Sequence, residues 1–333
     1  MSDAPVLLRA TGVRKHFPVR SSGVLRREVA QLKAVDGVDL EVGQGETLGL
    51  VGESGCGKST LSRCLMRLTD LTAGKVEVDG RDISGMSRAA LRPVRREMQM
   101  VFQDPYASLN PRQRVRTIIG LPLRIHHAVP RRQINARVHE LLDVVGLRRE
   151  HADRFPHEFS GGQRQRIGIA RALALRPRLL IADEPVSALD VSVQAQVINL
   201  LADLRDDFGL ACLLVAHDLS VVRQVSDRIA VMYLGRIVEV GPVLEVTASP
   251  THPYTEALVS AVPIPDPNIA VRRERIVLRG DVPSPVSPPA GCRFHPRCRH
   301  ATDICRTEDP PLVPHRAADH LAACHHPRNV SKI

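Results

Sequence analysis

The strongest constraint on this chain is a short glycine-rich segment between an apolar run and a helical pattern. Gly52-Glu-Ser-Gly-Cys-Gly-Lys-Ser-Thr60 matches the pattern G-x-x-x-x-G-K-[ST] at every defined position. The run before it, Thr47–Val51, predicts a buried strand, and Lys58–Leu68 predicts a helix with leucines on one face. Glycines let such a loop curl so that backbone N–H groups and the helix N-terminus point at phosphate oxygens. The segment therefore predicts a phosphate-binding loop in an α/β fold.

The side chains of this loop have separate expected tasks. Lys58 can reach the terminal phosphates of a nucleotide, and the Ser59 hydroxyl can ligate Mg²⁺. Cys56 occupies a variable position of the pattern, and we expect it to fill space rather than act as a nucleophile. The residues expected to contact the nucleotide here are Gly52, Ser54, Gly55, Cys56, Gly57, Lys58, Ser59 and Thr60.

Two acids follow a second buried strand far along the chain. Leu179–Asp183 is apolar up to its last residue, and Glu184 comes next. An acid at the carboxyl end of a parallel strand faces the ligand crevice of an open sheet. We expect Asp183 to hold Mg²⁺ through water and Glu184 to polarise the attacking water as general base. The alternative is a pair of acids that cap a turn before Pro185.

The order of patterns along the chain predicts an α/β architecture in several parts. Short strands are expected over residues 5–50, and Val76–Val78 with Asp79-Gly80 predicts a hairpin edge, so an antiparallel β subdomain is expected beside the main sheet. Residues 104–175 have a helical pattern, and strand and helix patterns then alternate, which indicates a mostly parallel sheet. The expected division is a domain over 1–245, with the helical insertion at 104–175, and a proline- and cysteine-rich extension over 246–333.

Composition limits the class of protein. The chain has 333 residues, a net charge of +10, nine Phe and Tyr together and no Trp. The charge suits an anionic partner, but the few aromatic residues count against single-stranded nucleic-acid binding, which relies on stacking. No apolar run reaches the ~18 residues needed to span a bilayer, and Met1–Ala10 lacks a signal-peptide pattern. We therefore expect an intracellular chain that does not itself span a membrane.

A third motif identifies the family that the chain resembles. Phe159-Ser-Gly-Gly-Gln-Arg-Gln-Arg166 stands between the phosphate loop and the acid-ended strand. With those neighbours it resembles the signature of ATP-binding cassette (ABC) transporter subunits, and the likeness covers about residues 6–245. The resemblance implies a P-loop NTPase core of the RecA-like type. It also implies binding of ATP and Mg²⁺, and ATP hydrolysis.

The resemblance assigns further residues by motif. Phe17 stands where an aromatic ring stacks on adenine, and His217 stands where a histidine contacts the γ-phosphate and joins Glu184 in catalysis. Gln103 matches a glutamine that contacts the metal and senses the membrane partner, so Mg²⁺ is expected on Ser59, Gln103 and Asp183. Two subunits are expected to dimerise head to tail. The residues expected to reach the partner's nucleotide are Ser160, Gly161, Gly162, Gln163 and Asp190.

The tail resembles one subgroup of the family. Pro250–Leu258, Gly280–Pro289 and Gly291–Cys298 are similar to the C-terminal extension of oligopeptide and dipeptide import ATPases. The implied protein is a peripheral motor at the cytoplasmic face of the cell membrane. Its implied partners are a second, non-identical ATPase, two transmembrane permease subunits and, indirectly, an extracytoplasmic solute-binding protein. The alternatives are a motor for nickel or another solute, or a soluble ABC-type ATPase that acts on nucleic acid or ribosomes.

Four of the seven cysteines gather in the tail, at Cys292, Cys298, Cys305 and Cys324. In an intracellular chain such a group favours metal binding over disulfides. The gaps are wider than in common zinc ribbons, which favours a [4Fe–4S] cluster, and some peptide-importer ATPases resemble this pattern. Because histidines lie nearby in the sequence, a Zn²⁺ site with cysteine and histidine ligands is an alternative. Unligated reduced thiols are the third hypothesis.

Overall fold

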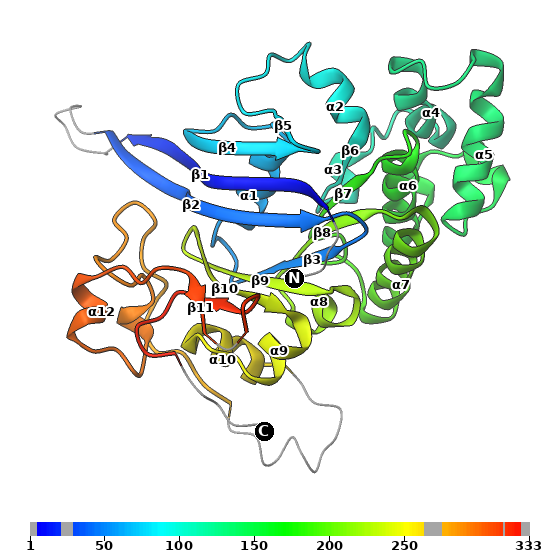
Figure 1. Cartoon of the computed structure of the whole chain (residues 1–333). Coiled ribbons are helices and arrows are strands. Elements are labelled where there is room, and N and C mark those ends of the chain that lie inside the picture. The colour runs from blue at the N-terminus through cyan, green and yellow to red at the C-terminus, as the bar shows by residue number, and fades with distance from the viewer. Residues whose placement is uncertain (1–4, 21–28, 263–274, 316, 328–333) are drawn as a thin grey trace.

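The structure is a computed structural model that describes residues 5–20, 29–262, 275–315 and 317–327. The expectation about Met1–Ala10 falls partly outside this range. So do residues 263–274 of the proline-rich tract, which covers residues 249–289, and the end of the predicted extension. Figure 1 shows one sheet beside the main body of strands and helices, a helical region at one end, and the C-terminal segments below the strands.

The main sheet has eight strands in the order β11-β12-β10-β9-β3-β8-β7-β6. Strands β9, β3, β8, β7 and β6 are parallel, whereas β10, β12 and β11 extend the sheet as an antiparallel edge. The strands with continuous apolar sequences are buried on both faces, as expected for a parallel sheet covered by helices. The bounds are β3 (Thr47–Val51), β6 (Met98–Val101), β7 (Leu179–Asp183), β8 (Ala211–Ala216), β9 (Arg228–Tyr233), β10 (Arg236–Pro242), β11 (Val313–Pro314) and β12 (Leu321–Ala322).

The second sheet is antiparallel and has the order β2-β1-β4-β5. Its strands are β1 (Val6–Arg20), β2 (Val29–Gly43), β4 (Ala73–Val78) and β5 (Arg81–Asp82). The predicted hairpin edge is confirmed, but the prediction of short strands is wrong for the part of the chain before β3. Instead, β1 and β2 are 15 residues each and pair along their length, with register shifts that interrupt the alternation of side chains. Those irregularities hide a long strand from a search for strict period-two patterns.

Helices fill the predicted insertion and cover the main sheet. The helices before β7 are α1 (Lys58–Leu65), α2 (Leu91–Glu97), α3 (Pro105–Ser108), α4 (Val115–Ile125), α5 (Ile134–Val144) and α6 (Gly161–Leu173). After β7 come α7 (Val191–Phe208), α8 (Leu219–Val225), α9 (Val243–Ala248), α10 (Pro253–Ser260) and α12 (Asp303–Thr307). Three-residue to five-residue 3₁₀ segments stand at Arg131–Gln133, Arg149–Asp153, Pro156–Glu158 and His295–Arg297. In Figure 1, α4 to α7 form the helical region at one end.

The C-terminal segments return to the main body of the protein. β12 pairs with β10 through Glu239 and Val240, and β11 pairs with β12, so the end of the chain completes the main sheet. Figure 1 shows α9, α10 and α12 on the same side of the molecule as this edge. The domain division at residue 245 stays a prediction, because the extension shares a sheet with the segment before it.

Candidate functional site

The predicted phosphate loop joins the central strand β3 to α1. Gly52, Gly55 and Gly57 all have positive φ, at 156°, 79° and 110°. A Cβ atom on Gly52 would lie 2.1 Å from the Met232 carbonyl oxygen, and one on Gly57 would lie 2.1 Å from the Ala34 carbonyl oxygen. Glycine is therefore required at these two positions by both backbone conformation and space.

Lys58 begins α1 and is buried beneath the loop. Its ammonium group donates hydrogen bonds to the carbonyl oxygens of Gly52 at 2.7 Å and Glu53 at 3.1 Å. The lysine thus bridges the two ends of the loop while its charge stays next to the place where phosphates are expected. Burial raises the pKa of the neighbouring Cys56 thiol, which keeps it protonated and agrees with a space-filling role.

The magnesium ligands expected from the sequence are partly assembled at the end of β7. The Ser59 hydroxyl donates a hydrogen bond to the Asp183 carboxylate at 2.9 Å. Burial raises the pKa of the Asp183 carboxyl, the hydrogen bond from Ser59 opposes this shift, and the charge of Glu184 adds to it. A hydroxyl and a carboxylate side by side are the oxygen donors that Mg²⁺ prefers.

Glu184, directly after β7, has an uncommon backbone conformation. Its φ is +46°, a left-handed conformation that is strained for a residue with a Cβ atom, and its N–H donates to the Val215 carbonyl at 2.9 Å. The turn directs its carboxylate to accept a hydrogen bond from Gln103 Nε2 at 2.9 Å. His217 Nδ1 lies 3.8 Å from the same carboxylate oxygen. Three residues predicted from separate motifs therefore meet at one carboxylate.

A cavity of about 300 Å³ lies over the phosphate loop. Most of the predicted nucleotide-contacting residues line it, together with the acid predicted as general base: Phe17, Ser54, Gly55, Cys56, Gly57, Lys58, Ser59, Thr60, Gln103 and Glu184. Phe17 is partly exposed, and the Lys15 ammonium lies 4.9 Å from the centre of its ring. Gly52 and Asp183, which are both buried, are not among the residues that line this cavity.

Several residues that line the cavity were missed by the sequence interpretation. These are Leu32, Lys33, Ala34, Leu234, Gly235 and Pro285. Pro285 belongs to the proline-rich tract, and the Lys33 N–H donates to its carbonyl oxygen at 3.0 Å. The tract was recognised as a family feature, but proline content alone gives no signal that it reaches the nucleotide cavity.

The signature residues lie on a different element. Ser160 is the N-cap of α6: its hydroxyl accepts from the Gln163 N–H at 3.4 Å, and Gln163 Oε1 accepts from the Ser160 N–H at 3.1 Å. Gly162 packs so closely that a Cβ atom there would lie 2.3 Å from Val193. Asp190 is the exposed N-cap of α7. Among the described residues, the signature segment and Asp190 do not line the cavity over the phosphate loop of their own chain.

The four clustered cysteines are brought together at a small cavity in the extension. Cys292, Cys298, Cys305 and Cys324 line it with His252, Pro253, Phe294, His295, His300, His325 and His326. Among the described residues none of the four forms a disulfide, and burial raises the pKa of Cys324 to about 12. Within the described parts of the chain, however, no three His, Cys, Asp or Glu side chains are grouped so that they could hold a metal ion. The convergence was predicted, whereas ligand geometry is not formed.

The sequence predicts that the chain has no segment that spans a membrane. In the described residues, no helix combines the length and the apolar character needed to cross a bilayer.

Two family descriptions match the chain. "ABC transporter" matches residues 35–187, which include the phosphate loop, the signature and the acid-ended strand. "Oligopeptide/dipeptide transporter, C-terminal region" matches residues 238–305, which include three of the four clustered cysteines.

Relatives and solved structures agree with these matches. The chain is 54% identical to the oligopeptide transport ATP-binding protein AppF of Bacillus subtilis, over 97% of this chain and 98% of that protein. It is 51% identical to the oligopeptide transport ATP-binding protein OppF of Salmonella typhimurium, over 92% of both chains. The fold matches the dimeric ATP-binding cassette MJ0796 bound to ADP and Pi with a TM-score of 0.63 and 29% identity, over 71% of this chain and 99% of that chain. It also matches cbiO1 of Clostridium perfringens, part of the transporter complex cbiONQ, with a TM-score of 0.62 and 26% identity, over 73% of this chain and 90% of that chain.

Full-length identity above one half, the assembled phosphate loop and the shared cassette fold lead to one conclusion: the chain belongs to the ATP-binding proteins of ABC transporters, with the C-terminal region of the oligopeptide/dipeptide group.

Proposed function

We propose that this chain is the ATP-hydrolysing motor subunit of an importer for di- and oligopeptides. The observation that carries the proposal is the meeting of Lys58, Gln103 and Glu184 around one cavity, joined to a tail of the oligopeptide/dipeptide type. Both relatives named above are oligopeptide transport proteins, which supports peptides over nickel or another solute as cargo.

The residues suggest how ATP is held. Adenine would stack on Phe17 at one end of the cavity, while the phosphates would lie over the backbone N–H groups of the loop. Mg²⁺, when bound through Ser59, Gln103 and Asp183, would neutralise charge that develops on the phosphates. Binding near Gln103 competes with its hydrogen bond to Glu184. We infer that this bond is exchanged when nucleotide enters, which frees the Glu184 carboxylate to accept a proton from the attacking water.

The site of one chain is incomplete, and a partner supplies the rest. The α6 N-terminus presents the exposed Ser160 and the half-exposed Gln163, away from the cavity of its own chain. N–H groups at a helix N-terminus bind phosphate well. We infer that Ser160–Gln163 and Asp190 contact the ATP held by a second, non-identical ATPase subunit. Closure of that dimer would move two permease subunits, to which the chain binds peripherally at the cytoplasmic face. An extracytoplasmic solute-binding protein would deliver the peptide.

A reconstitution experiment tests this function. The chain is co-expressed with candidate ATPase and permease subunits, and the complex is placed in vesicles with a candidate solute-binding protein. We expect ATP hydrolysis to rise when the binding protein is loaded with di- or oligopeptides, and labelled peptide to enter the vesicles. Stimulation by Ni²⁺ instead would transfer the proposal to a metal importer. Nuclease-sensitive association with ribosomes, without permease subunits, would refute a transport role.

For the cysteine-lined cavity we propose a [4Fe–4S] cluster, with Zn²⁺ as the alternative. The supporting observation is that Cys292, Cys298, Cys305 and Cys324 line one cavity although 32 positions of sequence separate the first from the last. Ligation would require the thiols to deprotonate and to rearrange, since the described residues show no ligand geometry. Bound there, a cluster would cross-link segments of the extension. A redox function does not follow from its presence.

Anaerobic purification decides between these occupants. A [4Fe–4S] cluster would give absorbance near 400 nm together with bound iron, and both would fall when Cys305 is changed to Ser. Cys212→Ser is the matched control, because Cys212 is buried in β8, outside the cysteine-lined cavity. Stoichiometric zinc without absorbance would select the alternative. A preparation with neither metal would leave reduced thiols and reject both.

A further inference from the structure

One residue of the phosphate loop is bound by the C-terminal extension. The Glu53 carboxylate accepts two hydrogen bonds from the guanidinium of Arg297, at 2.7 Å from Nη1 and 3.1 Å from Nη2. The Arg297 side chain is only 7% exposed, and that of Glu53 is 28% exposed. Paired, parallel hydrogen bonds of this kind are among the stronger polar contacts in proteins, and burial reduces their screening by solvent.

The backbone of the same loop residue is held independently. The Glu53 N–H donates a hydrogen bond to the hydroxyl oxygen of Tyr254 at 2.8 Å. Tyr254 is fully buried in α10, and its ring centre lies 4.7 Å from that of Tyr233 and 5.4 Å from that of Phe294. These two contacts of Glu53, through its carboxylate and its N–H, therefore come from the extension, and Tyr254 is fixed in an aromatic cluster.

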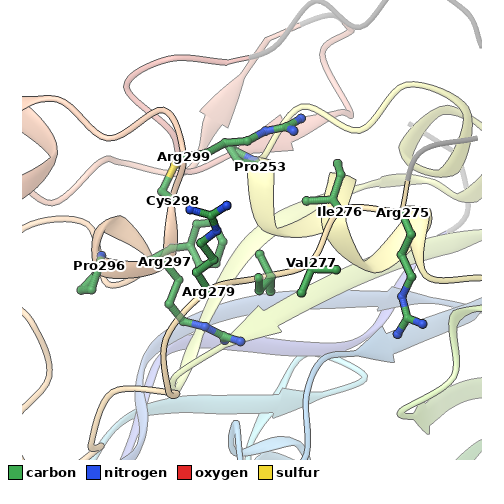
Figure 2. A pocket seen from close by; sticks show the side chains of 11 residues that line it. Pro253, Arg275, Ile276, Val277, Arg279, Pro296, Arg297, Cys298 and Arg299 are labelled. Carbon is green, nitrogen blue, oxygen red and sulfur yellow. The ribbon is translucent and has the colours of Figure 1, made fainter.

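The charge of Arg297 is used by the loop rather than by a second cavity that Arg297 also lines. That cavity, of about 680 Å³, is also lined by Arg275, Arg279 and Arg299. Figure 2 shows Arg297 and Cys298 on one side of it and Arg275 on the other. Arg299 forms an ion pair with Glu256 at 3.1 Å, and Arg297 forms its pair with Glu53. Two of the four positive charges are thus neutralised by carboxylates, so the cavity is a weak candidate for an anion site.

The pair has two physical consequences for ATP. A carboxylate one residue from Gly52 would repel the nucleotide phosphates, and the guanidinium cancels that charge. Phosphate contacts in such a loop come from backbone N–H groups, whose directions depend on the curl of the loop. On the inner side of the loop, the hydrogen bonds from Lys58 to the carbonyl oxygens of Gly52 and Glu53 support this curl. The contacts of Glu53 to Arg297 and Tyr254 hold the curl from the side of the extension. The loop therefore loses less conformational entropy when ATP binds.

We propose that Arg297, together with Tyr254, is a positioning residue for the phosphate loop, and that the extension thereby strengthens ATP binding. The proposal rests on the ATP-binding role given above and adds the extension to that site. Arg297 directly precedes Cys298, so one short segment contributes both to the cysteine-lined cavity and to the support of the loop.

The test measures ATP affinity and steady-state hydrolysis in the assembled transporter with full-length chains. Arg297→Gln should raise Kd and KM for ATP about tenfold, the effect of losing a charge-assisted pair, with kcat changed less than about twofold. Arg297→Lys should recover part of the affinity, since it restores the charge but not the paired geometry. Arg299→Gln is the matched control: it removes a neighbouring, half-exposed arginine that pairs with Glu256, and should leave Kd unchanged.

A double-mutant cycle keeps the proposal testable if Arg297→Gln folds poorly. Glu53→Gln removes the same pair from the other side, so the double variant should change Kd by less than the product of the two single effects. Effects that simply multiply would overturn the proposal. So would an Arg297→Gln variant that melts at a lower temperature yet binds ATP like wild type. Failure of the wild type to bind ATP would instead count against the proposed function itself.

Discussion

Gln103 and Glu184 are joined by a 2.9 Å hydrogen bond across 81 positions of sequence, from the glutamine amide to the glutamate carboxylate. The bond connects the segment after β6 to the turn after β7, at adjacent strands of the sheet. In its proposed role as general base, Glu184 is oriented and occupied by this bond, so nucleotide entry and activation of the base would be linked through the Gln103 amide.

Replacing Glu184 by Gln should separate ATP binding from hydrolysis. The amide keeps the size of the side chain but cannot accept the proton of water, and general-base catalysis contributes about 10²–10⁴-fold. We expect hydrolysis to fall by at least about a hundredfold, while ATP binds and the closed dimer accumulates. Phosphate release and size-exclusion chromatography with ATP measure the two effects.

Asp207→Asn is the control for this variant, because Asp207 is an exposed carboxylate of α7 outside the nucleotide cavity. It should hydrolyse ATP like wild type. Wild-type turnover in Glu184→Gln would remove Glu184 from the role of general base.

A carboxylate at the signature helix should act only on the partner's nucleotide. Gly161→Asp places a negative charge at the first position of α6, where a Cβ atom meets only the Leu189 side chain at 3.1 Å. We expect the Kd for ATP of the single chain to stay within about twofold, because this helix does not line its own cavity. Hydrolysis in the assembled dimer should be lost through repulsion of phosphate.

Mixed assemblies locate that effect. When only this chain carries Gly161→Asp, the site whose phosphate loop belongs to the partner should fail, and labelling with a photoreactive ATP analogue should show this. A loss of ATP binding in the single chain would contradict a role in trans.

Gly52 and Gly55 form a matched pair for testing the shape of the loop. Both have positive φ, but only at Gly52 would a Cβ atom collide, 2.1 Å from the Met232 carbonyl oxygen and 2.8 Å from Cys56 Sγ. Gly52→Ala should abolish ATP binding and lower the free energy of unfolding by about 3 kcal/mol or more, combining strain with overpacking.

Gly55→Ala has no neighbour within 4 Å and carries conformational strain alone. It should lower the free energy of unfolding by about 1 kcal/mol. Chemical denaturation and calorimetric ATP titration measure both variants. Equal effects would mean that space around Gly52 is not the constraint.

His151 should make the helical region sensitive to mild acid. Its ring packs edge-on against Phe159 at 5.3 Å, its Nδ1 is buried without a partner in the described structure, and burial lowers the pKa of the imidazole. The unfolded chain, with the ordinary pKa near 6.5, then binds a proton more readily than the folded chain. Stability from this group is complete above about pH 6.5 and declines as the pH falls below it.

The melting temperature should therefore drop between pH 7.5 and 5.5 by more in wild type than in His151→Phe, which keeps the aromatic contact but cannot titrate. Differential scanning calorimetry at matched ionic strength measures both profiles. Parallel profiles would exclude His151 as a source of the pH dependence.

Much of the nucleotide site could be predicted from the sequence because each part is a local motif with its own chemistry. The strands Thr47–Val51 and Leu179–Asp183 have the predicted bounds. Their continuous apolar runs are typical of strands buried on both faces. Helix ends were less predictable: α1 ends at Leu65 rather than Leu68, and Arg131–Gln133 forms a 3₁₀ segment before α5.

Contacts between distant segments could not be predicted in the same way. Nothing near Glu53 indicates a partner 244 positions later, and Arg297 stands in a segment noted for its cysteines and its family resemblance, not for a contact with the loop. The 15-residue strands β1 and β2 were also hidden, because bulges break the alternation that marks a strand.

The sequence alone determined the identity of the loop, the acids and the signature, since glycine spacing, carboxylates and helix starts express their chemistry locally. Only the tertiary structure decided that the extension completes the main sheet and holds the phosphate loop from behind. The physical reason is that pairing between strands and burial of an ion pair depend on which surfaces meet after folding. A sequence pattern shows that a residue can form an ion pair or a strand contact, but it does not show which distant residue will be the partner.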